Sequence, residues 1–122
     1  MYKVIFYKDV HEHQPVKEYM DELSEKSASN KDVRIKLSKV YEYIEVLKRN
    51  GTRAGRNYVK YVRDGVWELR PLKDRILFFY WRDNMFVLLH QFQKKTRKTP
   101  EREIEKAIRN KDDFIKRSGY NE

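Results

Sequence analysis

The feature that most constrains the fold is the run of residues 75–81, Arg-Ile-Leu-Phe-Phe-Tyr-Trp, which is apolar at every position after the first. A half-exposed strand alternates apolar and polar side chains, whereas a strand that is buried on both faces is continuously apolar. The apolar part is also far shorter than the roughly 20 residues that cross a bilayer. The run therefore predicts a central strand of a sheet that is covered by helix on each side.

Segments of period two surround this run and predict an antiparallel meander. Its four strands cover residues 58–63, 66–70, 75–81 and 85–92. The turns between them hold Asp64-Gly65, residues 71–74 and Asp83-Asn84, which are residues typical of tight turns. Residues 2–7 are β-branched and aromatic, and they predict a separate N-terminal strand.

Apolar residues spaced three and four apart predict three helices. The first begins at Pro15 and carries Val16, Tyr19, Met20 and Leu23 on one face. After a polar break, Ser29 or Asn30 caps the second, which Gly51 ends. Thr99 is predicted to cap the third, with Pro100 at its first position and its end at Ser118-Gly119. The predicted fold is α+β: an N-terminal strand, a helical hairpin, a four-strand antiparallel meander and a C-terminal helix.

Positive charge is concentrated in one stretch of the chain. The net charge is +9, from 28 Lys+Arg against 19 Asp+Glu, and residues 53–98 account for +8 of it with 12 basic and 4 acidic side chains. Such a concentration is typical of a surface that binds nucleic acid, although a solvated basic face without a partner would give the same count. The chain has no cysteine, which excludes disulfides and thiol chemistry, and it has no signal-peptide pattern, so we expect a cytoplasmic protein.

Hairpin geometry predicts which side chains share a face of the sheet. A two-residue turn at Asp64-Gly65 would pair Tyr61 with Glu68, and a two-residue turn at Asp83-Asn84 would pair Leu77 with His90. The residues expected on one face are Tyr61, Arg63, Glu68, Arg70, Arg75, His90, Phe92 and Lys94, whereas Lys60 and Trp67 are expected on the other. Cations with interspersed aromatic rings suit phosphate binding and base stacking, as in recognition of single-stranded RNA.

Two members of this set also have a purely structural interpretation, which we favour. Glu68 can form a cross-strand ion pair with Arg70 or Arg75, and His90 can be an interior histidine held by a hydrogen bond. His11 and His13 lie in a polar loop without further ligands at metal spacing. No metal and no other cofactor is expected.

The order of elements and three motifs resemble the RelE/ParE toxin superfamily. The motifs are Trp67-Glu68-Leu69-Arg70, residues 75–79 and the run Leu-Leu-His-Gln-Phe-Gln-Lys-Lys-Thr-Arg-Lys-Thr-Pro of residues 88–100. Within the superfamily the chain is most similar to the HigB branch, also described as phage-derived Gp49-like proteins. The resemblance covers almost the whole chain and implies one domain over residues 1–122 with a RelE-like microbial RNase fold.

The resemblance implies the toxin of a type II toxin-antitoxin system. Such a toxin is a ribosome-dependent mRNA endonuclease, or mRNA interferase, that cleaves mRNA in the A site and inhibits translation. Attack of the ribose 2′-OH on the adjacent phosphate leaves a 2′,3′-cyclic phosphate without a metal. The implied partners are mRNA, the ribosome with its rRNA, and a helix-turn-helix antitoxin of the HigA kind. The antitoxin would neutralise the toxin in a heterotetramer and would supply any contact with operator DNA, and no membrane is involved.

The resemblance also implies roles for individual residues. Arg75 matches the arginine that contacts the transition-state phosphate, and Arg70 would position the phosphate. Lys94, Lys95 and Lys98 match the basic strand end, and one of them would act as acid or base. The remaining RNA contacts are expected from Arg63, His90 and Arg97, with Tyr61 or Phe92 stacking on a base.

The chain also departs from its RelE-like relatives. They carry two lysines where this chain has Val66 and Glu68, and a tyrosine where it has Ile104. Glu68 is therefore the substitute base if no lysine serves. Two other functions stay open at this point: a ParE-like gyrase inhibitor and a basic nucleic-acid-binding protein without catalysis.

Overall fold

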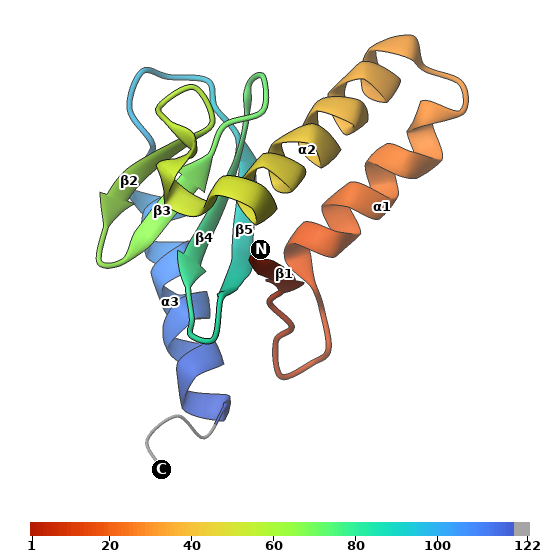
Figure 1. Cartoon of the computed structure of the whole chain (residues 1–122). Coiled ribbons are helices and arrows are strands. Elements are labelled where there is room, and N and C mark those ends of the chain that lie inside the picture. Colours follow the sequence, from red (N-terminus) through yellow and green to blue (C-terminus); the bar gives the residue numbers. More distant parts are fainter. Residues whose placement is uncertain (119–122) are drawn as a thin grey trace.

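In the computed structural model, which describes residues 1–118, three helices pack on a mixed five-stranded sheet of order β1-β5-β4-β3-β2 (Figure 1). The strands are β1 (Lys3–Phe6), β2 (Val59–Arg63), β3 (Val66–Leu69), β4 (Asp74–Tyr80) and β5 (Met85–Gln93). The three α-helices of residues 1–118 are α1 (Pro15–Ser27), α2 (Lys31–Asn50) and α3 (Glu101–Arg117), and a short 3₁₀ helix, η1 (Gly51–Ala54), follows α2. The predicted α+β order of elements is confirmed.

The four C-terminal strands form the predicted antiparallel meander, and β1 adds to it as a parallel neighbour of β5. This places β4 at the centre of the sheet, where Ile76, Leu77 and Phe78 are each 0% exposed. The expectation of a central strand that is covered on both faces is therefore confirmed.

Two apolar clusters, one on each face, hold the helices to the sheet. Alternate residues of β4 divide between them, with Ile76 and Phe78 facing the α1–α2 hairpin and Leu77 and Phe79 facing α3. Figure 1 shows the hairpin extending well beyond the sheet, with the loop between α1 and α2 at its far tip. The site described below lies at the edge of the sheet where β4 begins and β5 ends, outside both clusters.

The ends of the helices follow the predicted signals in part. The Asn30 side chain accepts a hydrogen bond from the Val33 N–H (3.1 Å) and so caps α2, which ends at Gly51 with φ +60°. The predicted cap of α3 is wrong, because the Thr99 hydroxyl donates to Glu68 instead and the helix follows Pro100 without a side-chain cap. Of the predicted helix end, Ser118 is the residue after α3, and Gly119 lies outside the described residues.

One predicted strand register is wrong. Arg63 lies opposite Val66 as expected. A β-bulge between Tyr61 and Arg63 then shifts the register of the earlier part of β2, so Lys60 lies opposite Glu68 and Tyr61 opposite Trp67. The bulge exchanges the faces of Lys60 and Tyr61 relative to the prediction, because one extra residue in a strand reverses the alternation of side chains beyond it.

A second irregularity leaves the predicted pairs in place. The β4–β5 turn is longer than two residues, since the Met85 N–H bonds to the Arg82 carbonyl and the Trp81 N–H bonds to the Met85 carbonyl. A register shift at Leu89 offsets this difference, so that Leu77 lies opposite His90 and Arg75 opposite Phe92, as predicted.

Candidate nucleic-acid interface

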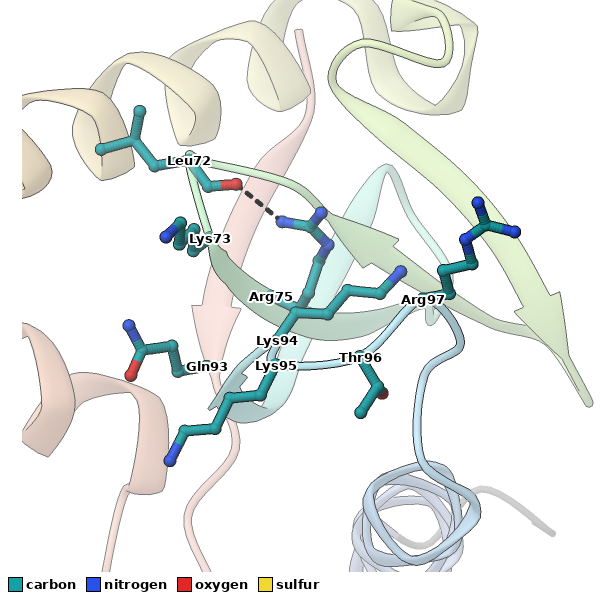
Figure 2. Close-up of a pocket in the computed structure, with 8 residues that line it drawn as sticks. All are labelled: Leu72, Lys73, Arg75, Gln93, Lys94, Lys95, Thr96 and Arg97. Atoms are coloured by element: carbon teal, nitrogen blue, oxygen red, sulfur yellow. Dashed lines mark hydrogen bonds between the residues drawn. The ribbon is translucent and has the colours of Figure 1, made fainter.

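The largest pocket of the described structure, with a volume of about 620 Å³, lies at the end of the sheet where β4 begins and β5 ends (Figure 2). Antiparallel pairing places Asp74 opposite Gln93, and the Lys94 N–H donates to the Lys73 carbonyl over 2.8 Å. The pocket is lined by Leu72, Lys73, Arg75, Gln93, Lys94, Lys95, Thr96 and Arg97. Five of these eight residues are cationic and none is acidic, so the lining of the pocket suits an anion.

Four of the five cations of this pocket are not neutralised by a carboxylate of the described residues. Within residues 1–118, Lys73, Lys94, Lys95 and Arg97 form no ion pair with any carboxylate. Arg63 differs in this respect, because it pairs with both Asp64 and Glu101. Unpaired cations in one concave surface produce a stronger positive potential than cations whose charge is already compensated.

Arg75 is fixed by its own loop. Its Nη1 donates to the carbonyls of Leu72 (2.9 Å) and Asp74 (2.8 Å), and only 11% of its side chain is exposed (Figure 2). Burial lowers the pKa of the guanidinium, an effect that the carboxylate of Glu68 partly opposes. The guanidinium is therefore held rigidly at the wall of the pocket.

Glu68 is a carboxylate that is 1% exposed and lies between two arginines. Its Oε1 accepts a hydrogen bond from the Thr99 hydroxyl (2.8 Å), while Oε2 lies 3.4 Å from Arg70 Nε and 3.7 Å from Arg75 Nε. Neither arginine contact meets hydrogen-bond geometry, so Oε2 has no hydrogen-bond partner within residues 1–118. The predicted common face of Arg70 and Arg75 and the predicted ion pairing of Glu68 are both confirmed.

Lys94 and Lys95 both follow the end of β5 but point in different directions. Lys94 extends toward Arg97 and Arg75, whereas Lys95 points away from them (Figure 2). Partial burial lowers the pKa of the Lys94 amine, and the charges of Arg75 and Arg70 lower it further, against the opposing effect of Glu68. Of the two lysines, Lys94 is the one that extends toward Arg75 and has a lowered pKa.

Arg63 and His90, both from the predicted set, do not line the pocket and are held by acidic partners. Arg63 pairs with Asp64 and Glu101, and His90 hydrogen-bonds Glu103 (2.6 Å), with burial lowering the pKa of its imidazole.

The two aromatic rings expected to stack on bases are engaged in the protein. The Tyr61 ring packs against Trp67 with centroids 5.2 Å apart, on the face of the sheet opposite Glu68. The Phe92 ring is 8% exposed and belongs to the cluster under α3. Neither ring therefore lines the five-cation pocket.

Two lysines that the sequence did not mark as site residues lie in this region. Lys73 lines the pocket from the β3–β4 turn. Its position next to the start of β4, close to Arg75 in the sequence, is the signal that could have marked it as a site residue. Lys60 lines an adjoining pocket together with Lys98, and only the bulge in β2 brings it there. Ile104, at the position where the resemblance implies a tyrosine, lines the same adjoining pocket.

The sequence of this region matches a known family. A family model described as phage-derived protein Gp49-like (DUF891) matches residues 18–112, more than three quarters of the chain. The chain belongs to this family. The Gp49-like family is part of the RelE/toxin-antitoxin-like group, and the matched range includes every residue of the five-cation pocket.

No curated protein matches the sequence closely enough to count as a relative. Among the described residues, no helix combines the length and the apolar character that a membrane-spanning segment requires.

Proposed function

We propose that this Gp49-like protein is a HigB-like toxin that cleaves mRNA in the ribosomal A site as a ribosome-dependent endoribonuclease. The observation that carries the proposal is the pocket of five cations without an acid, which adjoins two arginines that share one buried carboxylate. The membership in a toxin-antitoxin-type family supports it. In a mechanism without metal, such a cluster supplies the positive charge that the transition state of phosphodiester cleavage needs.

The arginines are the phosphate ligands of this mechanism. Arg75 has one nitrogen fixed by loop carbonyls, so its remaining donors keep a constant direction toward the pocket. Arg70 is anchored in the same way, because its Nη1 donates to the Arg56 carbonyl over 2.8 Å. Both guanidiniums would contact the non-bridging oxygens of the scissile phosphate, where negative charge builds up as the 2′-oxygen attacks.

Glu68 and Lys94 are the proton-transfer groups. The 2′-OH gives its proton to Oε2 of Glu68, the oxygen without a hydrogen bond, as the bond between the 2′-oxygen and phosphorus forms. Because Oε2 is buried against Arg70 and Arg75, this step requires the Arg70 side chain, the more exposed of the two, to turn toward the bound phosphate and uncover the oxygen. The bond from phosphorus to the 5′-oxygen breaks, and the Lys94 ammonium donates a proton to that leaving oxygen. The products are a 2′,3′-cyclic phosphate and a 5′-hydroxyl, and solvent restores the proton on Lys94 and removes the one on Glu68.

The test is incubation of the purified protein with ribosomes that are programmed with a defined mRNA, followed by mapping of the mRNA 5′ ends. We expect cuts within the A-site codon for the wild type. Arg75→Ala should lower the cleavage rate by about three orders of magnitude, because a transition-state cation is lost. Arg34→Ala, in the first turn of α2, is the matched control and should cleave like the wild type.

Other outcomes decide between this function and its competitors. Unchanged mRNA with wild-type protein would overturn the proposal. Inhibition of DNA supercoiling without mRNA cleavage would instead support a ParE-like gyrase inhibitor. Binding of mRNA without cleavage would support a basic nucleic-acid-binding protein.

The partner of the toxin follows from the same proposal. The toxin-antitoxin-type family suggests an antitoxin, and we propose a helix-turn-helix protein of the HigA kind, encoded in the neighbouring reading frame. Co-expression of that reading frame should suppress the mRNA cleavage of the wild type. Contact with operator DNA and assembly into a heterotetramer would come through this antitoxin.

A further inference from the structure

A second basic pocket adjoins the five-cation pocket. It is lined by Lys60, Tyr61, Val62, Glu68, Arg97, Lys98, Thr99 and Ile104. Arg97 lines both pockets and therefore lies between them. The two pockets together form a continuous basic surface from the β3–β4 turn to the segment that precedes α3.

The cations of the second pocket come from two distant parts of the chain. Lys98 belongs to the segment after β5, and Lys60 belongs to the edge strand β2, opposite Glu68. Both side chains are exposed, and within residues 1–118 neither forms an ion pair. The charge of Lys60 is also among the influences that lower the pKa of Lys94, so the electrostatic effects of the two pockets overlap.

The composition of the second pocket suits a nucleotide unit. Lys60, Arg97 and Lys98 supply positive charge, whereas Glu68 is covered by arginines and exposes 1% of its surface. Ile104 adds an apolar wall that a sugar or base can contact. An RNA strand with one phosphate in the first pocket must continue to a second phosphate, and the surface on the far side of Arg97 offers unpaired cations for it.

We propose that the second pocket binds the phosphate next to the scissile one in a single-stranded RNA, with Lys60 as its principal contact. This inference rests on the proposed function, since it takes the first pocket to hold the scissile phosphate. It assigns a role to a residue for which the sequence predicts the opposite face of the sheet. The bulge in β2 is then a functional feature, because it turns Lys60 toward the RNA.

The experiment compares two uncleavable ligands, a 2′-O-methyl dinucleotide with one phosphate and a 2′-O-methyl hexanucleotide, in equilibrium titrations at several salt concentrations. Lys60→Gln should weaken hexamer binding about three- to tenfold and should lower the salt slope by about 0.7, the contribution of one phosphate contact in a single strand. It should leave dinucleotide binding unchanged, because one phosphate occupies only the first pocket. Arg75→Gln should weaken both ligands.

Lys26→Gln is the matched control, because it removes an equal charge from an exposed lysine of α1. It should change neither titration. The inference is overturned if Lys60→Gln binds the hexamer like this control, if it weakens the dinucleotide as much as the hexamer, or if wild-type protein binds no hexamer. The absence of mRNA cleavage in the ribosome assay would overturn the proposed function and leave these binding results to stand on their own.

Discussion

At the scale of single residues, Glu68 is the buried charge of the site. A carboxylate that is 1% exposed loses its hydration, and it is stable only because opposite charges and a hydrogen bond replace the water. Arg70, Arg75 and Thr99 provide these replacements, but only Thr99 makes a hydrogen bond. In the proposed mechanism, its Oε2 accepts the proton once Arg70 turns toward the phosphate and uncovers this oxygen, while the charge of Glu68 holds the two guanidiniums together.

Glu68→Gln separates these two roles. The amide has nearly the same shape but cannot accept the 2′-OH proton, so we expect the cleavage rate to fall by about 10²- to 10⁴-fold. In the wild type, the fall of the cleavage rate at low pH reports protonation of the general base, and this fall should be absent from the pH–rate profile of Glu68→Gln. Thr99→Val is the comparison, because it removes only the hydrogen bond to Oε1 and should lower the rate about tenfold. A Glu68→Gln protein that keeps the fall at low pH and cleaves within tenfold of wild type would show that Glu68 only positions the arginines.

At the scale of elements, the sequence predicts the order and type of the three α-helices and the five strands of the described part of the chain, because their apolar periodicities are strong, but it does not predict the short 3₁₀ helix η1. It also predicts that Arg75 lies opposite Phe92. This prediction is correct because the longer β4–β5 turn and the register shift at Leu89 offset each other. The bulge in β2 carries no signal in the sequence, so the faces of Lys60 and Tyr61 could not be predicted. The prediction that Thr99 caps α3 is wrong because the buried carboxylate of Glu68, which has no other hydrogen-bond donor among the described residues, accepts the hydrogen bond of the Thr99 hydroxyl.

A buried polar contact joins the helical hairpin to the strand that carries Arg75. Asp74, the first residue of β4, is 2% exposed and accepts a hydrogen bond from the Tyr19 hydroxyl of α1. Lys36 of α2 reaches the other oxygen over 3.4 Å. Asp74 also presents its backbone carbonyl to Arg75 Nη1, so the hairpin supports the wall of the pocket.

Tyr19→Phe should therefore destabilise the protein. The substitution leaves one oxygen of a buried carboxylate without its donor, and we expect the free energy of unfolding to fall by about 1–3 kcal/mol. Urea unfolding followed by circular dichroism measures the change. Tyr41→Phe, which removes the hydroxyl of a half-exposed tyrosine on α2, is the control and should alter the free energy by less than about 0.5 kcal/mol. Equal stability of the two variants would contradict the structural role of the Tyr19–Asp74 contact.

At the scale of the whole molecule, two tyrosine hydroxyls join segments that are far apart in the chain. Tyr19 connects α1 to β4, and Tyr7, which follows β1, donates to Asp113 of α3 over 2.6 Å. Burial raises the pKa of Tyr7 to about 12, with the hydrogen bond to Asp113 acting in the same direction. Burial and the contact with Asp74 likewise raise the pKa of Tyr19. Both hydroxyls are therefore protonated in the folded protein at a pH where an unfolded chain has begun to lose its phenolic protons.

The consequence is a loss of stability at alkaline pH. Below the unfolded pKa of about 10, both states carry the Tyr7 proton and its stabilising effect is complete. Between pH 10 and about 12 the unfolded state ionises first, so the free energy of unfolding falls as the pH rises. The urea midpoint of the wild type should thus drop from pH 9 to pH 11, and Tyr7→Phe should show a smaller drop because it has no proton to lose. Tyr41→Phe should keep the full wild-type drop, since no hydrogen bond of its hydroxyl is formed within residues 1–118. If Tyr7→Phe loses as much stability as the wild type over this range, the hydroxyl of Tyr7 does not control the alkaline transition.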